Sequence, residues 1–170
     1  MHVTYEGRSY SSRAVGGPGA SGPGDTPITE ARPMAGSFGS AAPIFRVTDL
    51  EASLAYYTEK LGFAHDWGER GIASVSRGDC TILLTEWVQG QRGSWVWIGV
   101  EDAGALHEEL VARGARIRIP PTNYRWAFEM QVEDLDGNVL RLASGTREGV
   151  PYGDFLDAAG TLWPADIANA

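Results

Sequence analysis

The sequence predicts an α+β domain made of two βαβββ modules, which form a curled mixed sheet with a cleft and carry their helices on the outer face. Two observations predict this fold. The same order of strand-like and helix-like segments occurs twice along the 170 residues, and landmarks of the first half return in the second. Val47 and Asp49 correspond in this way to Val100 and Asp102. Such a repeat is typical of a duplicated unit that buries its apolar face against its own copy.

The first module begins with a short strand at 43–47 and continues into a helix. Asp49 has a side chain suited to cap that helix, and Gly62 is placed to end it. Apolar residues between these two follow one another at helical spacing: Leu50, Leu54, Tyr57 and Leu61. Three further strands, separated by glycines, are expected at 63–67, 72–76 and 81–85.

The second module repeats this order. A strand is expected at 95–100, Asp102 is suited to cap the next helix, and Gly114 is placed to end it. The remaining strands are expected at 116–119, 128–132 and 139–143. The segment Asp136-Gly137-Asn138 predicts a tight hairpin turn between the last two strands.

Composition sets the two ends of the chain apart from the domain. Residues 1–41 are rich in glycine, proline and serine and predict a flexible tail, because such a segment buries too little apolar surface to fold. Residues 42–144 hold the domain, and 145–170 form a C-terminal extension in which 154–159 is expected to make one or two helical turns. The two modules are expected at about 42–87 and 94–144.

The charge balance narrows the class of partner. Twenty-two acidic residues against 14 basic ones give a net charge of -8, which argues against binding to nucleic acids or anionic membranes and favours small, cationic ligands. Cys80 is the single cysteine, so no intrachain disulfide and no cysteine-based zinc site can form. No apolar run approaches the about 20 residues of a membrane span, and no secretory signal is visible, so we expect a cytoplasmic protein.

Several motifs resemble those of a known family. The segment Val47-Thr48-Asp49-Leu50 leads into Tyr56-Tyr57-Thr58-Glu59-Lys60-Leu61-Gly62-Phe63, and Asp134-Leu135-Asp136-Gly137-Asn138 forms the second-module hairpin. In order and spacing, these motifs resemble the vicinal oxygen chelate superfamily, which includes glyoxalases, extradiol dioxygenases, fosfomycin-resistance enzymes and bleomycin-resistance proteins. The resemblance covers about 42–144.

Within that superfamily the sequence is most similar to the bleomycin-resistance group. Three stretches carry the similarity: 77–81, 95–98, and Arg125-Trp126 followed by Glu129. The resemblance implies a protein that binds a drug without destroying it. It also implies a homodimer with two equivalent clefts between the subunits, often with the first strand exchanged.

The resemblance also indicates where the enzymes of the superfamily hold a divalent metal. The corresponding places are occupied here by Ala42, Trp95 and Arg141. Alanine and tryptophan offer no ligand atom, and the guanidinium group stays protonated and repels a cation. The histidines lie elsewhere, at His2, His65 and His107. We therefore expect no metal, no other cofactor and no catalytic residue of the ordinary family kind.

Strand alternation then predicts which side chains face the cleft. The candidate ligand-binding residues are Arg46, Trp67, Trp95, Trp97, Tyr124, Trp126, Glu129 and Arg141. Flat rings suit a planar aromatic or cationic ligand, and Glu129 could hold a cation. Arg46 and Arg141 either pair with Glu129 or hold an anionic or carbonyl group of the ligand. The alternative for some of the tryptophans is a place in the core or in a dimer interface.

The residues leave three functions open. The first is a cytoplasmic homodimer that sequesters a bulky aromatic, cationic small molecule such as a bleomycin-type antibiotic. The second is an enzyme of the same superfamily with an atypical site, either a lyase or isomerase or a dioxygenase-like enzyme. The third is a structural or regulatory partner protein with a vestigial cleft. Fold alone does not decide among them.

Overall fold

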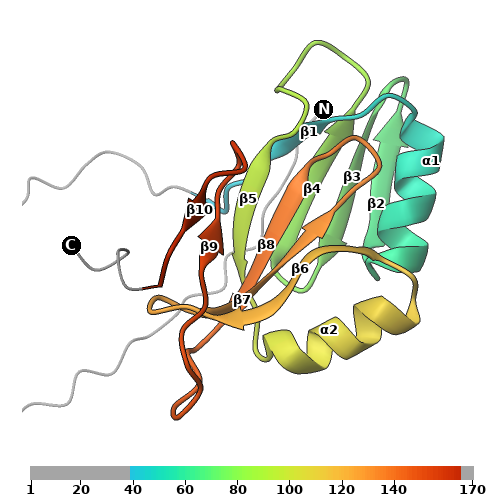
Figure 1. Ribbon diagram of the computed structural model, residues 1–170. Helices are drawn as coiled ribbons and strands as arrows, with labels where there is room; N and C mark the ends of the chain where they lie inside the picture. Colours follow the sequence, from blue (N-terminus) through green and yellow to red (C-terminus); the bar gives the residue numbers. More distant parts are fainter. Residues whose placement is uncertain (1–38, 166–170) are drawn as a thin grey trace, which may run out of the picture. The chain divides into compact units, whose positions relative to one another are not determined.

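The computed structural model describes residues 39–165 and contains the two expected βαβββ modules (Figure 1). The expected tail, 1–41, lies outside the described residues apart from its end at 39–41. Among the residues that the structure describes, no helix combines the length and apolar character that a membrane span requires.

The first module contains β1 (Ile44–Arg46), α1 (Leu50–Ala55), the π-helical segment η1 (Tyr56–Lys60), β2 (Ala64–Glu69), β3 (Ile72–Arg77) and β4 (Cys80–Thr85). The side chain of Asp49 caps α1, because its Oδ1 accepts a hydrogen bond from the backbone N–H of Ala52 at 3.0 Å. Gly62 follows the helical segment with φ +71, a backbone conformation that glycine adopts without strain. Both residues act as the sequence predicted.

The second module contains β5 (Trp95–Gly99), α2 (Ala103–Ala112), β6 (Arg116–Asn123), β7 (Phe128–Glu133) and β8 (Val139–Ser144). Asp102 caps α2 through hydrogen bonds from the N–H groups of Gly104 and Ala105, at 2.7 and 3.2 Å. β6 is longer than expected and continues through Pro120 and Pro121. β6 lies at the edge of its sheet, and its register with β7 shifts between Ile119 and Thr122, so the pairing is interrupted where the two prolines lack an N–H.

Each module forms its own four-stranded sheet with the same topology. The first sheet has the order β1-β4-β3-β2 and the second has the order β5-β8-β7-β6. In each sheet the first strand of the module pairs in parallel with the last, and the other neighbours are antiparallel. β1 pairs with β4 of its own chain, with Ile44 opposite Leu83.

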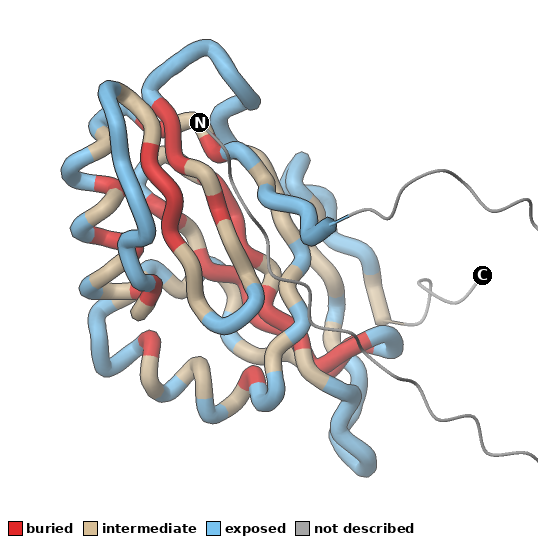
Figure 2. The backbone as a smooth tube through the Cα atoms, turned by 180° about the vertical axis from the view of Figure 1, so that it is seen from behind, coloured by how far each residue is buried: buried red, intermediate tan, exposed pale blue. Residues whose placement is uncertain are grey.

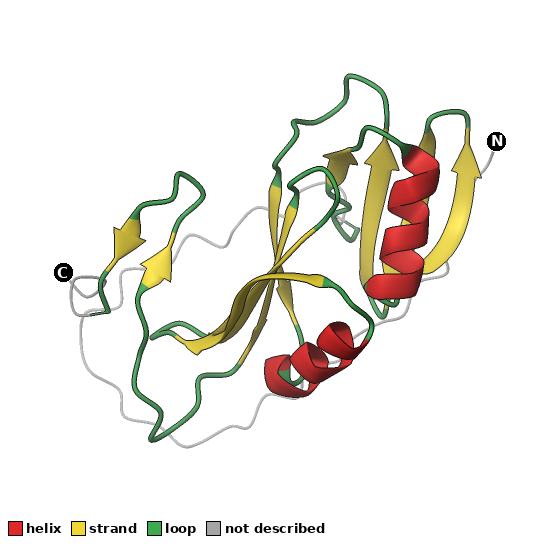
Figure 3. Cartoon of the chain, turned by 45° about the vertical axis from the view of Figure 1, so that its right-hand side comes forward, coloured by secondary structure: helices red, strands yellow, loops and turns green. Residues whose placement is uncertain are grey.

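One hydrophobic core joins the two modules. Each helix lies beside the sheet of its own module (Figure 3), and buried residues run along the strands between them (Figure 2). The core combines Phe45 and Tyr57 of the first module with Leu110, Met130 and Leu140 of the second. The side chains alternate along β8 as predicted, because Leu140 and Leu142 belong to the core and Arg141 between them does not.

Buried polar groups also link the modules. Asp134, at the start of the hairpin between β7 and β8, is 1% exposed. Its carboxylate accepts hydrogen bonds from the N–H groups of Asp136 and Asn138, the Asn138 side-chain amide and the Tyr57 hydroxyl. Burial raises the pKa of this carboxyl, although the Asn138 hydrogen bonds oppose the rise. The hairpin of the second module is thereby tied to the helical segment of the first.

Replacing Asp134 by alanine should destabilise the protein by about 2 kcal/mol, because buried donors of Asn138 and Tyr57 lose their acceptor. Urea unfolding followed by circular dichroism measures this loss. Glu108→Ala, on the exposed surface of α2, is the control and should change stability by less than about 0.5 kcal/mol. Equal stability of the two variants would contradict the assignment of Asp134 as the link between the modules.

An ion pair at the surface joins the modules a second time. Glu109 of α2 accepts hydrogen bonds from Arg77 of β3 at 2.7 Å and from Arg113 at 2.8 Å. The hydrogen bond from Arg77 holds the pKa of Glu109 below its ordinary value of 4.5. Since the folded-state pKa is lowered, this contribution to stability is present above the unfolded-state pKa and is lost as the pH falls through the folded-state value.

We therefore expect Glu109→Gln to lower the Tm at about pH 7 and to have a smaller effect at about pH 3, because the wild-type carboxyl becomes protonated as the pH falls through its folded-state pKa. Thermal unfolding at the two pH values gives the comparison, with Glu108→Gln as the exposed neighbouring control. An equal Tm difference at both pH values would show that the Arg77 contact does not depend on the charge of Glu109.

Candidate functional site

The candidate site lies on the face of the second sheet that points away from the core, here called the helix-free face. Its strands carry Trp95, Trp97, Glu129, Gln131 and Arg141 on this face. Trp97 lies opposite Arg141 in the strand register, and Arg141 lies opposite Gln131 on its other side. The neighbours of these residues, such as Val96, Ile98 and Met130, pack in the core or against it. Side chains that point to the core and side chains that point away from it therefore alternate along these strands as the sequence predicted.

A buried ion pair stands at the centre of this face. Arg141 donates two hydrogen bonds to Glu129, from Nε to Oε1 at 2.7 Å and from Nη2 to Oε2 at 2.9 Å. Glu129 is 0% exposed, whereas the Arg141 side chain retains 24% exposure. The two parallel bonds fix the carboxylate and balance its charge. The sequence left open whether Arg141 pairs with Glu129 or holds a group of the ligand. In the structure it pairs with Glu129.

Aromatic residues border the ion pair. Tyr124 and Trp126, in the connection between β6 and β7, stack with their ring centroids 4.9 Å apart and their planes 7° from parallel. Tyr124 is 2% exposed and lies beneath, whereas Trp126 is 47% exposed. The indole N–H of Trp126 donates to Oε2 of Glu129 at 3.4 Å. Burial raises the pKa of the Tyr124 hydroxyl, so this residue stays neutral at ordinary pH.

The two tryptophans of β5 lie at the edge of the same sheet. Trp97 is 55% exposed, and Trp95 is half-buried with the Arg118 guanidinium 5.2 Å from its ring centroid. Trp97 and Trp126 thus place two largely exposed indole rings around the ion pair, and a contiguous group of exposed rings on one face is a candidate for recognition of another molecule.

Arg46 and Trp67 belong to the other sheet. Arg46 lies in β1 and Trp67 in β2, next to a β-bulge, where it pairs with Ser74. Trp67 is largely exposed, and the Nε of Arg46 is buried without a hydrogen-bond partner in the described part of the chain. The structure thus brings Tyr124, Trp126, Glu129 and Arg141 together and leaves Arg46 and Trp67 on the first sheet.

The C-terminal extension supplies a site residue that the sequence analysis missed. The expected helical turns at 154–159 are wrong, because β9 (Phe155–Leu156) and β10 (Leu162–Trp163) form a short antiparallel hairpin. The Phe155 ring lies edge-on to Tyr124 and to Trp126, with centroids 5.7 and 5.4 Å apart. The Arg141 guanidinium is 5.1 Å from the same ring.

Asp157 is the physical reason for the hairpin. Its Oδ1 accepts hydrogen bonds from the N–H groups of Ala159 and Thr161, at 2.9 and 2.8 Å, which stabilises a turn in place of a helix. Gly160 follows with φ +81, which also favours a turn. The sequence signal for this hairpin was Asp157 and Gly160 between the apolar pairs 155–156 and 162–163, a pattern that is typical of two short strands joined by a turn.

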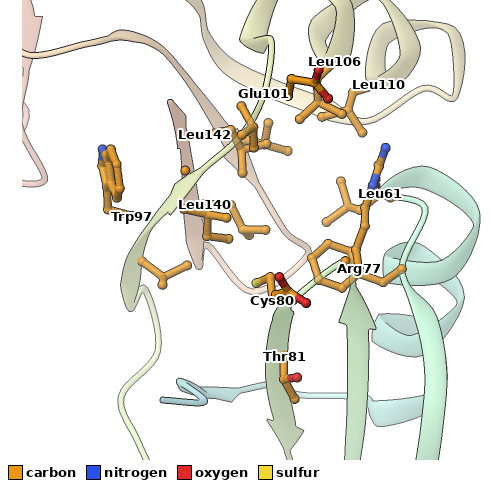
Figure 4. Close-up of a pocket in the computed structure, with 18 of the residues that line it drawn as sticks. Leu61, Arg77, Cys80, Thr81, Trp97, Glu101, Leu106, Leu110, Leu140 and Leu142 are labelled. Atoms are coloured by element: carbon orange, nitrogen blue, oxygen red, sulfur yellow. Dashed lines mark hydrogen bonds between the residues drawn. The ribbon is translucent and has the colours of Figure 1, made fainter. Parts of the chain in front are cut away.

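A separate cavity of about 1280 Å³ lies between the two modules on the side of the core (Figure 4). Its walls are mostly apolar and include Leu61, Cys80, Leu106, Leu140 and Leu142. Of the candidate ligand-binding residues, Trp97 borders it. The cavity and the helix-free face are therefore different features of the domain, and the candidates that belong to the second module gather on the latter, whereas Arg46 and Trp67 lie on the first sheet.

The places at which related enzymes would hold a metal do not suit one here. Ala42 and Trp95 provide no ligand atom, and Arg141 directs its guanidinium at Glu129. Within residues 39–165 there is also no group of three or more His, Cys, Asp or Glu side chains arranged to hold a metal ion. The side chains at these three places do not fit a divalent cation.

The comparison with protein families identifies this architecture. The model of the Glyoxalase/Bleomycin resistance protein/Dioxygenase superfamily matches residues 38–142. The chain belongs to this superfamily. The resemblance inferred from the sequence motifs is thereby confirmed. The superfamily match ends in β8, so the C-terminal hairpin that carries Phe155 lies beyond it.

Solved structures of the glyoxalase/bleomycin-resistance fold resemble the chain over most of their own length. A bleomycin-binding protein from Streptomyces verticillus, complexed with copper(II)-bleomycin, is 29% identical with a TM-score of 0.56, over 64% of this chain and 98% of that one. The antibiotic-binding protein TnmS3 from Streptomyces sp. CB03234 is 23% identical with a TM-score of 0.56, over 65% and 100%. No curated protein matches the chain significantly.

Proposed function

We propose that this protein is a cytoplasmic homodimer that binds and sequesters a bulky aromatic, cationic small molecule, such as a bleomycin-type antibiotic, without changing it chemically. The observation that carries the proposal is the set of exposed rings, Trp97 and Trp126, around the Arg141–Glu129 pair on one sheet face. Planar ligands gain binding energy by stacking on such rings, and the acidic chain attracts cations.

A homodimer would complete the site. The helix-free face of the second sheet provides one wall, and the first sheet carries Arg46 and Trp67 on its own strands. A two-fold axis that set the first sheet of one subunit against the second sheet of the other would create two equivalent clefts. Each cleft would then be lined by aromatic and charged residues of both subunits.

The comparisons support this choice of ligand class. The structural relative at 29% identity is a bleomycin-binding protein, solved with copper(II)-bleomycin. The superfamily also contains dioxygenases, which keeps the enzymatic alternative in view. Ala42, Trp95 and Arg141 argue against that alternative, because none of them is a metal ligand.

The proposal is tested with copper(II)-bleomycin and metal-free bleomycin as probes. Binding should raise the Tm in proportion to the logarithm of ligand concentration, and the recovered drug should keep its mass. Light scattering on the same sample should give twice the chain mass. No Tm shift with either probe, or a drug of altered mass, would refute sequestration of this ligand class.

The protein purified without an affinity tag should contain no stoichiometric zinc, manganese, iron or nickel, because three side chains at the family's ligand places cannot coordinate them. Elemental analysis by mass spectrometry provides the measurement. Arg141→Glu, which restores an acidic side chain at one of the three places, serves as the comparison and should also remain without metal. About one metal per chain in the wild type would favour the enzyme.

A further inference from the structure

The C-terminal hairpin covers part of the proposed site. Phe155 contacts the rings of Tyr124 and Trp126 and lies against the Arg141 guanidinium. Glu129 beneath Arg141 has no exposed surface, and Tyr124 is almost fully buried. Phe155 therefore occupies space next to Tyr124 and the ion pair that a ligand on the helix-free face would use, although part of Arg141 stays exposed beside it.

The hairpin is held together by its own hydrogen bonds. Asp157 accepts bonds from the turn that follows it and, through Oδ2, from the indole N–H of Trp163 at 2.9 Å. The base of the hairpin closes where the Ala165 N–H donates to Asp154 at 2.9 Å. Because these bonds lie within 154–165, this segment can move as one piece without losing them.

Hydrogen bonds fix the chain to the domain up to Gly153, whereas the described contacts beyond it are mainly those of the Phe155 ring. The Asn123 side chain, 2% exposed, donates to the carbonyls of Arg147 and Val150 at 3.0 and 2.8 Å. The Gly153 N–H donates to the Asn123 carbonyl at 2.8 Å. Past this point, the described hydrogen bond to the sheet is that from Gln131 Nε2 to the Leu156 carbonyl, which is 3.4 Å long.

We infer that residues 154–165 are a lid over the ligand site, with Phe155 occupying the place of a planar ligand group until a ligand displaces it. This inference rests on the proposed function, because it assumes that Trp126, Glu129 and Arg141 bind the ligand. The contacts that Phe155 makes, edge-on with two rings and against a guanidinium, are of the kind that a flat aromatic ligand would make there. The Gly153 anchor stays in place, and the segment beyond it swings away.

A lid of this kind lowers the apparent affinity of the site. If the closed form makes up about 90% of the free protein, the measured Kd is about tenfold higher than that of the open form. Phe155→Ala removes the ring that competes with the ligand. Asp157→Ala removes hydrogen bonds that hold the hairpin together but keeps the Phe155 side chain in the sequence. Leu162→Ala is the matched control, because Leu162 is an exposed apolar residue of the same hairpin.

The first measurement titrates copper(II)-bleomycin into the full-length variants by calorimetry. We expect about tenfold tighter binding by Phe155→Ala, an intermediate gain for Asp157→Ala, and no change for Leu162→Ala. Weaker binding by Phe155→Ala would overturn the lid and would make Phe155 a permanent wall of the site.

The second measurement needs no ligand. The Trp126 ring lies against Phe155 and its indole N–H donates to the buried Glu129, so the nuclear magnetic resonance signal of this proton, assigned by its loss in Trp126→Phe, reports on the covered part of the site. Exchange of this proton with water should be faster in Phe155→Ala and in Asp157→Ala than in the wild type and in Leu162→Ala. Unchanged exchange in both hairpin variants would overturn the lid.

The two measurements separate the lid from the proposed function. Absence of binding by every variant, including Phe155→Ala, would refute bleomycin-type recognition, and the exchange rates would still decide whether the hairpin opens. Tight binding by all variants with unchanged exchange would support the proposed function and overturn the lid.

Discussion

Replacing Trp126 by alanine is expected to weaken the binding of copper(II)-bleomycin by about tenfold to a hundredfold, because a ring that a ligand covers at the proposed site should contribute roughly 1–3 kcal/mol. Trp126 is stacked on Tyr124 and keeps 47% of its surface exposed. The truncation therefore removes ligand contacts and leaves no large cavity in the core. Titration calorimetry measures the loss of affinity.

Trp87→Ala is the matched control for this experiment. Trp87 is also 47% exposed, but it lies in the loop after β4 and outside the proposed site. Its replacement should leave the affinity within about twofold of the wild type. Melting curves of both variants show whether the fold survives. If Trp126→Ala unfolds the protein or binds as tightly as Trp87→Ala, the aromatic site is wrong.

Replacing Glu129 by glutamine should cost about 3 kcal/mol of stability, because it leaves the partly buried Arg141 without its charged partner. Glu129 has no exposed surface and accepts two hydrogen bonds from Arg141, at 2.7 and 2.9 Å. Denaturant unfolding gives the stability. The same variant should bind a cationic probe more weakly and with a flatter dependence on salt, because one carboxylate of the site is gone.

A double replacement distinguishes the ion pair from simple packing. Glu129→Gln combined with Arg141→Met removes both charges, so no uncompensated guanidinium remains in the site. We expect the double variant to be more stable than Glu129→Gln alone, as is common when a buried pair is removed completely. If the stability lost by the double variant equals the sum of the losses in Glu129→Gln and Arg141→Met alone, the two side chains are not coupled.

Sequence alone determined the local structure of this protein. Asp49 and Asp102 cap helices because a short carboxylate side chain reaches the free N–H groups of its own helix, which lie two or three residues away. The alternation of Leu140, Arg141 and Leu142 predicted which side chains leave the core, because successive residues of a strand point to opposite faces. The repeat of these signals was enough to predict both modules.

Tertiary structure decided how the site is assembled. The sequence offered two arginines as partners of Glu129, and strand order decides between them. Arg141 pairs with Glu129 because their strands, β8 and β7, are neighbours, whereas Arg46 belongs to the other sheet. The contact of Phe155 with Tyr124 and Trp126 depends on the path of 145–153, which Asn123 directs through hydrogen bonds to residues far along the chain. The spacing of residue types along the sequence cannot predict such contacts, because they depend on where distant segments of the chain meet in the folded structure.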